Sequence, residues 1–189
     1  ALLTMRRAFF LNLIKTNNMY YNDKTILFLD GKWVKANDAS TDLFSQTLHY
    51  GSGVFEGIRS YETEDGALVF KAKEHYERLH YSAEKMHINL KYSVEELTAL
   101  TYELLEKNNL QNAYIRPLVY LGQNMSLQPT EEVHVMLCAW NWERYLGDHQ
   151  LKLMTSSFQR PNPKSCFVEA KVTGHYTNSI LATTEAKKK

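Results

Sequence analysis

The alternation of apolar and polar positions predicts two β-hairpins in the first part of the chain. Residues 26–29 and 32–34 are mostly apolar, and the Asp-Gly pair between them is typical of a two-residue hairpin turn. Residues 58–61 and 67–70 flank a loop that contains a second Asp-Gly pair. Both hairpins indicate an antiparallel sheet.

Two amphipathic helices are predicted to follow the hairpins. From residue 73 to 87, apolar side chains recur at intervals of three and four positions, which places them on one helix face. A second helix is expected to begin at Ser93, because a serine followed by Glu96 three positions later forms a capping box. This helix runs to about Lys107 and is expected to be core scaffolding.

Two longer strands are predicted at residues 113–121 and 132–140. In the first, Tyr114 and Arg116 share one face with apolar neighbours. An arginine in this position either faces solvent or points inward, where it needs a partner because an unpaired buried charge is costly. Pro117 cannot donate a ladder hydrogen bond, so this strand should lie at a sheet edge or carry a bulge.

Less regular patterns fill the rest of the chain. Residues 122–130 are expected to form a loop and residues 151–156 a strand. An extended run that ends at Lys171 and a helix from about Tyr176 complete the prediction. Antiparallel strands with separate helices are typical of an α+β fold.

Composition and charge exclude several classes of function. Hydrophobic residues at 44% and charged residues at 23% are ordinary for a soluble globular protein. A formal net charge of +1 without a dense basic stripe argues against a nucleic-acid partner. The two cysteines are too few for a disulfide framework, and the seven histidines lack metal-ligand spacing. We therefore predict no metal site and a cytoplasmic location.

The first 22 residues differ from the rest because they contain Arg6, Arg7 and Lys15 but no acidic residue. Their apolar run, residues 8–14, is too short to span a bilayer, so no membrane partner is expected. A targeting segment is one interpretation, but no small-residue cleavage site follows cleanly. An extension or an alternative start before Met19 is the favoured interpretation.

Lys171 is the first candidate for chemistry. A lysine amine acts as a covalent catalyst when its neutral form is favoured and its tip is held against a carbonyl carbon. Gly174 would let the backbone turn closely around a bound group, and Tyr176 would return a phenol to the site. From spacing alone, a solvated surface lysine is the commoner alternative.

Two further stretches carry candidate groups. Residues 49–57 contain three glycines, which permit close backbone approach to a ligand or a neighbouring subunit, although ordinary loops share this pattern. Arg78 lies at the edge of the apolar face of the first helix. Its guanidinium could pair with a carboxylate or hold a phosphate, and the residues alone favour the ion pair.

Four stretches, in this order, resemble the class IV aminotransferases that use pyridoxal 5′-phosphate (PLP), and especially the bacterial branched-chain-amino-acid aminotransferases. They are residues 48–59, 74–79, 112–117 and 169–179, and the resemblance runs from about Phe28 to the last residue. It implies an α+β fold with a small N-terminal α/β domain, built from a largely antiparallel sheet and two helices. The beginning of a larger β-rich pseudobarrel domain, as in D-amino-acid aminotransferase, would follow.

The resemblance also divides the chain into four parts. These are an N-terminal extension (1–22), a small domain (23–141), an interdomain linker (142–150) and the incomplete beginning of a large PLP-binding domain (151–189). Family members continue beyond this point, so we expect the chain to lack the glutamate that pairs with the pyridine nitrogen.

The resemblance implies a role for each candidate residue. Lys171 would hold PLP as an aldimine and later move a proton, Arg78 would bind the phosphate, and Tyr176 would hydrogen-bond the ring oxygen next to the imine. The implied substrate pocket consists of Tyr50, Phe55, Tyr114, Arg116, Leu127, Trp142 and Tyr145. Among these, Arg116 and Tyr114 would meet the distal carboxylate of glutamate. Tyr50 and the loop with Leu127 would act across the interface of a homodimer.

The implied reaction is transamination of L-leucine, L-isoleucine and L-valine with 2-oxoglutarate. A D-amino-acid aminotransferase or an aminodeoxychorismate lyase would keep Lys171 and Arg78 and is one alternative. The Tyr-Ile-Arg-Pro run at 114–117 favours the branched-chain activity. A catalytically silent binding or assembly module is the other alternative.

Overall fold

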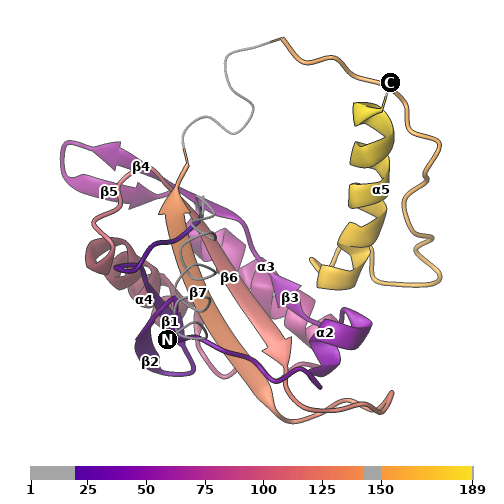
Figure 1. Cartoon of the computed structure of the whole chain (residues 1–189), viewed down its shortest axis with the longest axis horizontal. Helices are drawn as coiled ribbons and strands as arrows, with labels where there is room; N and C mark the ends of the chain where they lie inside the picture. The colour runs from indigo at the N-terminus through magenta and orange to yellow at the C-terminus, as the bar shows by residue number, and fades with distance from the viewer. Residues whose placement is uncertain (1–19, 143–149, 189) are drawn as a thin grey trace, which may run out of the picture.

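A single antiparallel sheet organises the computed structural model, which describes residues 20–142 and 150–188. The strand order is β2-β1-β7-β6-β4-β5, with β3 paired to β6 (Figure 1). The strands are β1 (Ile26–Leu29), β2 (Lys32–Lys35), β3 (Val54–Phe55), β4 (Ile58–Thr63), β5 (Gly66–Val69), β6 (Ala113–Leu121) and β7 (Val133–Asn141). The helices are α2 (Gln46–Tyr50), α3 (Ala72–Lys85), α4 (Val94–Lys107) and α5 (Tyr176–Lys187), with a 3₁₀ turn η1 (Thr173–His175) before the last.

Both predicted hairpins are confirmed. Strands β1 and β2 pair through a turn in which Asp30 has φ 48° and Gly31 has φ 84°. Positive φ at both central residues is the requirement of the type I′ turn, which is why an Asp-Gly pair occurs there. In the second hairpin Thr63 pairs with Gly66, so Gly66 already belongs to β5.

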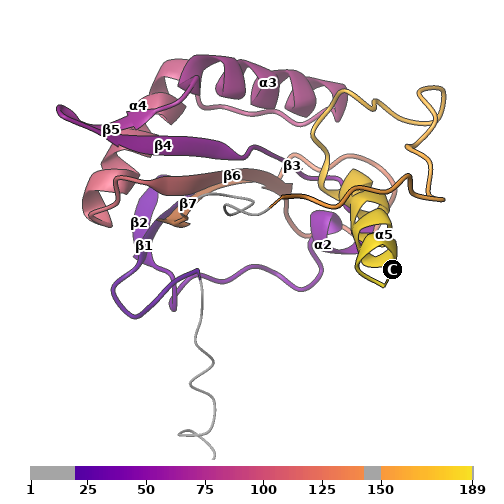
Figure 2. The same cartoon turned by 90° about the horizontal axis from the view of Figure 1, so that it is seen from above.

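The two predicted amphipathic helices cover one face of the sheet (Figure 2). Helix α3 buries Tyr76, Leu79 and Ala83 against the sheet, and it ends at Lys85 rather than at residue 87. Helix α4 buries leucines on its own inward face. These side chains meet alternate residues of β6 and β7, which form the other half of the core. None of the helices in the described ranges is both long and apolar enough to cross a membrane.

The capping box at the start of α4 gives a direct test of how this helix is stabilised. Ser93 Oγ accepts from the backbone N–H of Glu96 at 3.1 Å, and the Glu96 carboxylate accepts from the Ser93 N–H at 2.7 Å. Ser93→Ala should therefore lower the free energy of unfolding by about 1 kcal/mol in urea denaturation. Glu95→Gln removes a charge from the first turn but leaves the capping box intact, so it should lower the free energy of unfolding by only roughly 0.3 kcal/mol. Equal losses would contradict this role of Ser93.

The prediction for Pro117 is wrong, because β6 lies inside the sheet rather than at an edge. Its register with β7 runs without a bulge, and Pro117 pairs with Leu137. On the other side, the neighbouring strand is interrupted between β3 and β4, and Glu56 donates its N–H to the Pro117 carbonyl at 3.0 Å. The N–H and C=O of one residue point to the same side of a strand. The backbone nitrogen of Pro117 therefore faces the interruption between β3 and β4, where no ladder hydrogen bond requires an N–H.

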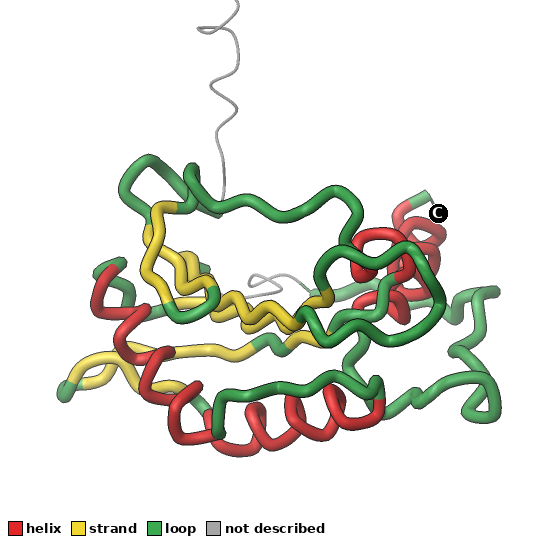
Figure 3. The backbone as a smooth tube through the Cα atoms, turned by 90° about the horizontal axis from the view of Figure 1, so that it is seen from below, coloured by secondary structure: helices red, strands yellow, loops and turns green. Residues whose placement is uncertain are grey.

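The expected strand at residues 151–156 and the extended run up to Lys171 are also wrong. Residues 150–171 form loops and turns (Figure 3). Leu153 is 88% exposed, and no strand of the described residues lies alongside to supply ladder partners. Instead, Ser156 and Ser157 donate to the carboxylate of Glu185 in α5, at 2.6 Å and 2.9 Å. The helix predicted from about Tyr176 is confirmed as α5.

Candidate active site

The backbone around Lys171 is attached to the sheet and to α3. Phe55 donates its N–H to the Lys171 carbonyl at 3.1 Å, and Val172 forms a bridge with Val54 of β3. The Lys171 N–H in turn donates to the hydroxyl of Ser82 at 2.9 Å. Ser82 is fully buried on α3, so this contact is shielded from water. The lysine is therefore fixed from two directions, although it lies far along the sequence from both partners.

Two glycines bring the Lys171 segment next to the end of α2. Gly51 ends α2 with φ 67°, and its carbonyl accepts from the Gly174 N–H at 2.9 Å. A Cβ added to Gly51 would come within 2.7 Å of the Gly174 Cα, which leaves no room for a side chain. The close approach expected of these glycines thus joins two segments of the same chain.

The Lys171 amine meets a phenol and an aromatic wall. Its Nζ donates to the Tyr176 Oη at 2.5 Å. The same nitrogen lies 4.8 Å from the centre of the Phe55 ring, which packs edge-on against Tyr176 at 4.8 Å. The turn η1 and the start of α5 return Tyr176 to the lysine, as the spacing predicts.

Lys171 and Arg78 line one cavity of about 170 Å³. Its other charged or polar lining groups are Arg160, Glu169, His175, Tyr176 and Ser179. An amine, a phenol and a guanidinium around one small cavity form a donor set that suits a ligand with a carbonyl at one end and an anion at the other. This donor set fits the aldehyde and phosphate of PLP.

Arg78 pairs with Glu56, which is the carboxylate alternative that the residues alone favour. Its Nε and Nη2 donate to the two carboxylate oxygens at 2.6 Å and 2.7 Å. Burial alone would raise the pKa of Glu56, but hydrogen bonds from Arg78 and His75 offset it and hold that pKa below its usual value. The hydrogen bond to Glu56 likewise raises the pKa of Arg78. Both groups are therefore charged at neutral pH.

Arg116 lies on the face of the sheet that the helices leave open, in contact with aromatic rings. Its Nη2 donates to the Tyr114 hydroxyl at 2.9 Å, and its guanidinium carbon lies 4.5 Å from the centre of the Phe55 ring. Trp142 packs against Tyr114 at 5.3 Å. The Nε of Arg116 is buried and has no hydrogen-bond partner among the described residues. The Phe55 ring thus contacts both this guanidinium and the Lys171 amine.

None of the described residues predicted for the substrate pocket lines the Lys171 cavity; these are Tyr50, Phe55, Tyr114, Arg116, Leu127 and Trp142. Phe55 nevertheless lies against the Lys171 amine. Tyr50 donates its hydroxyl to the Met125 carbonyl at 3.0 Å, and Leu127 is 87% exposed on the same loop. The buried side chain of Gln46 holds that loop by donating to two of its carbonyls at 3.0 Å and 2.8 Å. Tyr145, the remaining predicted pocket residue, lies outside the described residues.

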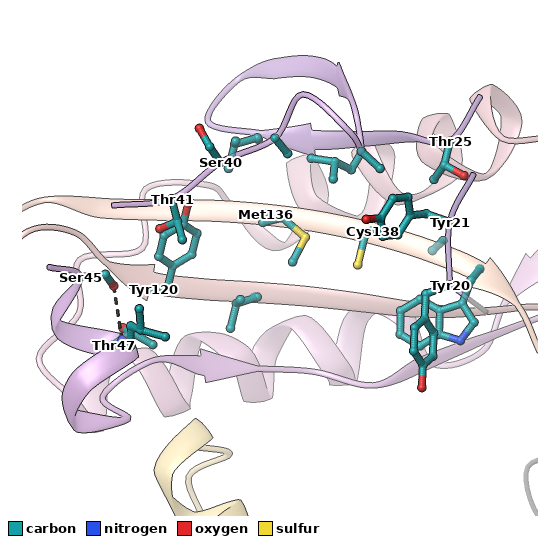
Figure 4. Close-up of a pocket in the computed structure, with 18 residues that line it drawn as sticks. Tyr20, Tyr21, Thr25, Ser40, Thr41, Ser45, Thr47, Tyr120, Met136 and Cys138 are labelled. Atoms are coloured by element: carbon teal, nitrogen blue, oxygen red, sulfur yellow. Dashed lines mark hydrogen bonds between the residues drawn. The ribbon is translucent and has the colours of Figure 1, made fainter. Parts of the chain in front are cut away.

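A second, apolar cavity of about 440 Å³ lies on the open face of the sheet (Figure 4). Tyr120, Met136 and Cys138 project into it from β6 and β7, and Tyr20 packs against Trp140 at its end. Burial raises the pKa of the Cys138 thiol to about 11, although nearby Arg116 acts in the opposite direction. The thiol is therefore protonated at neutral pH.

Cys138 should react slowly with iodoacetamide, whereas Cys166 serves as an internal control. At pH 8 a thiol with a pKa of about 11 is ionised in about one molecule in a thousand, and only the thiolate is alkylated efficiently. Mass spectrometry of timed samples should show Cys138 alkylation at least about tenfold slower than that of Cys166. Raising the pH to 10 should accelerate the Cys138 reaction by roughly 100-fold. A Cys138 rate that stays constant over this range would contradict the shift.

Sequence reasoning missed Glu56 and Ser82 as parts of the site. Glu56 belongs to the glycine-rich motif but carries no local signal that its carboxylate is buried. Ser82 falls on the inward face of the predicted helix at residues 73–87, where a hydroxyl needs a partner. A serine on this buried face was therefore the signal that its hydroxyl binds another segment of the chain.

The chain is similar in sequence to known aminotransferases. A family model described as amino-transferase class IV matches residues 53–189. The branched-chain-amino-acid aminotransferase of Pseudomonas aeruginosa is 41% identical over 167 residues, which cover 85% of this chain and 54% of that protein. The chain therefore spans about half the length of the curated relatives it matches.

Solved structures agree with this relationship. The T.th. branched-chain amino acid aminotransferase with pyridoxamine 5′-phosphate superposes with a TM-score of 0.81 at 35% identity, over 87% of this chain and 56% of that chain. The branched-chain aminotransferase of Thermoproteus uzoniensis with norvaline gives a TM-score of 0.82 at 34% identity, over 85% and 55%. The fold, the Lys171 cavity and the sequence matches together show that this chain belongs to the class IV aminotransferase family.

Proposed function

We propose that this chain carries the lysine half of a PLP-dependent transaminase site for branched-chain L-amino acids and 2-oxoglutarate. The observation that supports it is that Lys171 and Arg78 line the same cavity, with the Tyr176 phenol on the lysine nitrogen. The relatives named as branched-chain aminotransferases, one of them solved with pyridoxamine 5′-phosphate, support the choice of cofactor and reaction. We further propose residues 23–141 as the small domain, 142–150 as the linker and 151–189 as the beginning of a larger domain.

Each residue of the cavity has a distinct task in this proposal. PLP, when bound, supplies an aldehyde for covalent attachment and a conjugated ring that accepts electrons from a substrate Cα–H bond. Lys171 would hold the cofactor through its amine. Once free, that amine would act as general base toward the substrate Cα proton and as general acid toward the cofactor carbon that receives it. Tyr176 orients the amine through its hydroxyl, and Arg78 neutralises the phosphate.

The open sheet face would select the substrate. Phe55 and Trp142 supply apolar surface for an aliphatic side chain, and Arg116 with the Tyr114 hydroxyl receives the distal carboxylate of glutamate. An arginine whose Nε is buried without a described partner favours an anionic ligand at this place. In the same proposal, Tyr50 and Leu127 act on the partner subunit of a homodimer, and Tyr145 completes the pocket. The dimer and the cytoplasmic location remain predictions.

Arg116→Met separates the two substrates of the proposed reaction. Methionine keeps much of the apolar contact with Phe55 but removes the cation, so glutamate should lose a charge-assisted interaction that leucine never makes. We expect kcat/KM for glutamate to fall at least about tenfold more than kcat/KM for leucine. Steady-state transamination assays on the full chain measure both, and Tyr114→Phe is a milder control that removes only the hydroxyl.

Several outcomes of these assays would contradict the proposal. Equal losses for glutamate and leucine in Arg116→Met would remove Arg116 from the carboxylate site. Turnover of D-amino acids in place of L-amino acids would favour a D-amino-acid aminotransferase. An absence of covalent PLP at saturating cofactor would favour a silent binding module.

A further inference from the structure

Glu56 is a buried charge whose position the proposed reaction does not explain. Its side chain is 0% exposed, and no other Asp, Glu, Lys or Arg of the described residues is buried to this degree. It lies at the interruption between β3 and β4, where its backbone N–H is bound to Pro117. A carboxylate without water is costly unless it is paired and hydrogen-bonded. Both of its oxygens are indeed satisfied.

The contacts of Glu56 fix the guanidinium of Arg78 at two points. Oε1 accepts from Arg78 Nε at 2.6 Å, and Oε2 accepts from Arg78 Nη2 at 2.7 Å. Oε2 also meets His75 Nδ1 at 2.8 Å and the Gly57 N–H at 3.2 Å, so the carboxylate itself is held in place. A parallel two-point contact sets the plane of the guanidinium as well as its position.

Arg78 nevertheless remains available to a ligand. Its side chain is 49% exposed and lines the Lys171 cavity. The contacts to Glu56 use the Nε–H and one N–H of Nη2, which leaves both N–H groups of Nη1 and the second N–H of Nη2 as donors that can meet an anion. A long arginine side chain loses considerable rotamer freedom when it binds a ligand unless it is already ordered.

We propose that Glu56 is a positioning residue, which holds Arg78 in the orientation that receives the phosphate of PLP. This inference rests on the proposed function, because it takes PLP as the ligand of the cavity. The opposite possibility is that Glu56 competes with the phosphate for Arg78. The two differ in sign, since loss of a competitor would tighten PLP binding, whereas loss of a positioning carboxylate would weaken it.

Glu56→Gln tests this sign in equilibrium titrations with PLP and with pyridoxal, which lacks the phosphate. Glutamine has nearly the same shape, but its NH₂ group would face an Arg78 donor, so the two-point contact is lost. The Kd for PLP should rise at least about tenfold, the equivalent of one charge-assisted hydrogen bond. The Kd for pyridoxal should change less than about threefold, because no phosphate is involved.

A double-mutant cycle with Arg78→Met shows whether Glu56 acts through Arg78. Once Arg78 is absent, Glu56→Gln should no longer change the ratio of the pyridoxal and PLP dissociation constants. The inference would be overturned if Glu56→Gln left the ratio of the pyridoxal and PLP dissociation constants unchanged, or if it tightened PLP binding. It would also be overturned if Glu56→Gln changed this ratio equally with and without Arg78. Glu56→Asp covers the case in which glutamine prevents folding. Aspartate keeps the negative charge, but its side chain is one methylene shorter, so the carboxylate no longer reaches Arg78 as closely. The ratio of the pyridoxal and PLP dissociation constants should therefore fall, and a ratio equal to that of the wild type would overturn the inference.

The same titrations separate the inference from the proposed function. Wild-type protein that binds PLP no more tightly than pyridoxal would overturn the role of Glu56 and Arg78, since the phosphate would then gain nothing. Covalent bonding of both aldehydes to Lys171 in that experiment would leave the proposed function standing. Absence of any Lys171-dependent bonding would instead contradict the proposed function.

Discussion

Lys171→Ala is expected to abolish covalent capture of PLP and to lower transaminase turnover by at least about 10⁴-fold. Lys171 is the only lysine among the described residues that line its cavity, so no other amine there can replace it. Its Nζ is already directed at the Tyr176 hydroxyl, 2.5 Å away. The absorbance spectrum of protein mixed with PLP measures the first effect, because bound and free cofactor absorb differently.

Two matched variants control for loss of charge. Lys171→Arg keeps a cation in the cavity but has no amine that can bond to an aldehyde, so it should fail as completely as alanine. Lys164→Ala removes an exposed lysine and should behave like the wild type. A spectral change that survives in Lys171→Ala would show that PLP bonds elsewhere or binds without a covalent bond.

Gly51→Ala should lower the free energy of unfolding by roughly 2–5 kcal/mol. An L-residue at φ 67° costs about 1–2 kcal/mol by itself. The new Cβ would also lie 2.7 Å from the Gly174 Cα, so one backbone must move. That movement would break the hydrogen bond between Gly174 and Gly51, which helps to hold the Lys171 segment. Urea denaturation measures the loss in stability, and hydrogen exchange at Gly174 measures the loss of the contact.

Gly31→Ala is the matched control for backbone strain. Gly31 also has a positive φ, at 84°, but a Cβ there would meet only the Tyr92 hydroxyl, at an ordinary 3.7 Å. Gly31→Ala should therefore lower the free energy of unfolding by about 1–2 kcal/mol and leave hydrogen exchange at Gly174 unchanged. If both substitutions cost the same, the contact between the two glycines contributes little to stability.

Local signals in the sequence predicted the elements whose structure depends on near neighbours. The Asp-Gly turn needs only two residues with positive φ, and the capping box of α4 needs only Ser93 and Glu96. The helix after Lys171 begins at Tyr176 as expected. For the turn and the capping box, the stabilising contacts lie within a few residues, so a single sequence is sufficient to predict them.

Contacts between distant residues explain the errors. Pro117 occurs in an inner strand because the neighbouring strand breaks at Glu56, which the sequence around Pro117 does not encode. The segment at 151–156 has the composition of a strand, but a strand also needs a partner. The contact between Ser82 and Lys171 joins residues 89 positions apart. Which alternative Arg78 adopts likewise depended on where Glu56 lies.

Reduction with borohydride, followed by peptide mapping, tests most directly whether this chain bonds PLP through the predicted amine. Protein saturated with PLP is reduced so that any imine becomes a stable amine link, then digested and analysed by mass spectrometry. We expect a phosphopyridoxyl group on Lys171 in nearly every molecule and on no other lysine to a comparable extent. A label spread over surface lysines, or Lys171 left unmodified, would contradict the assignment of this site.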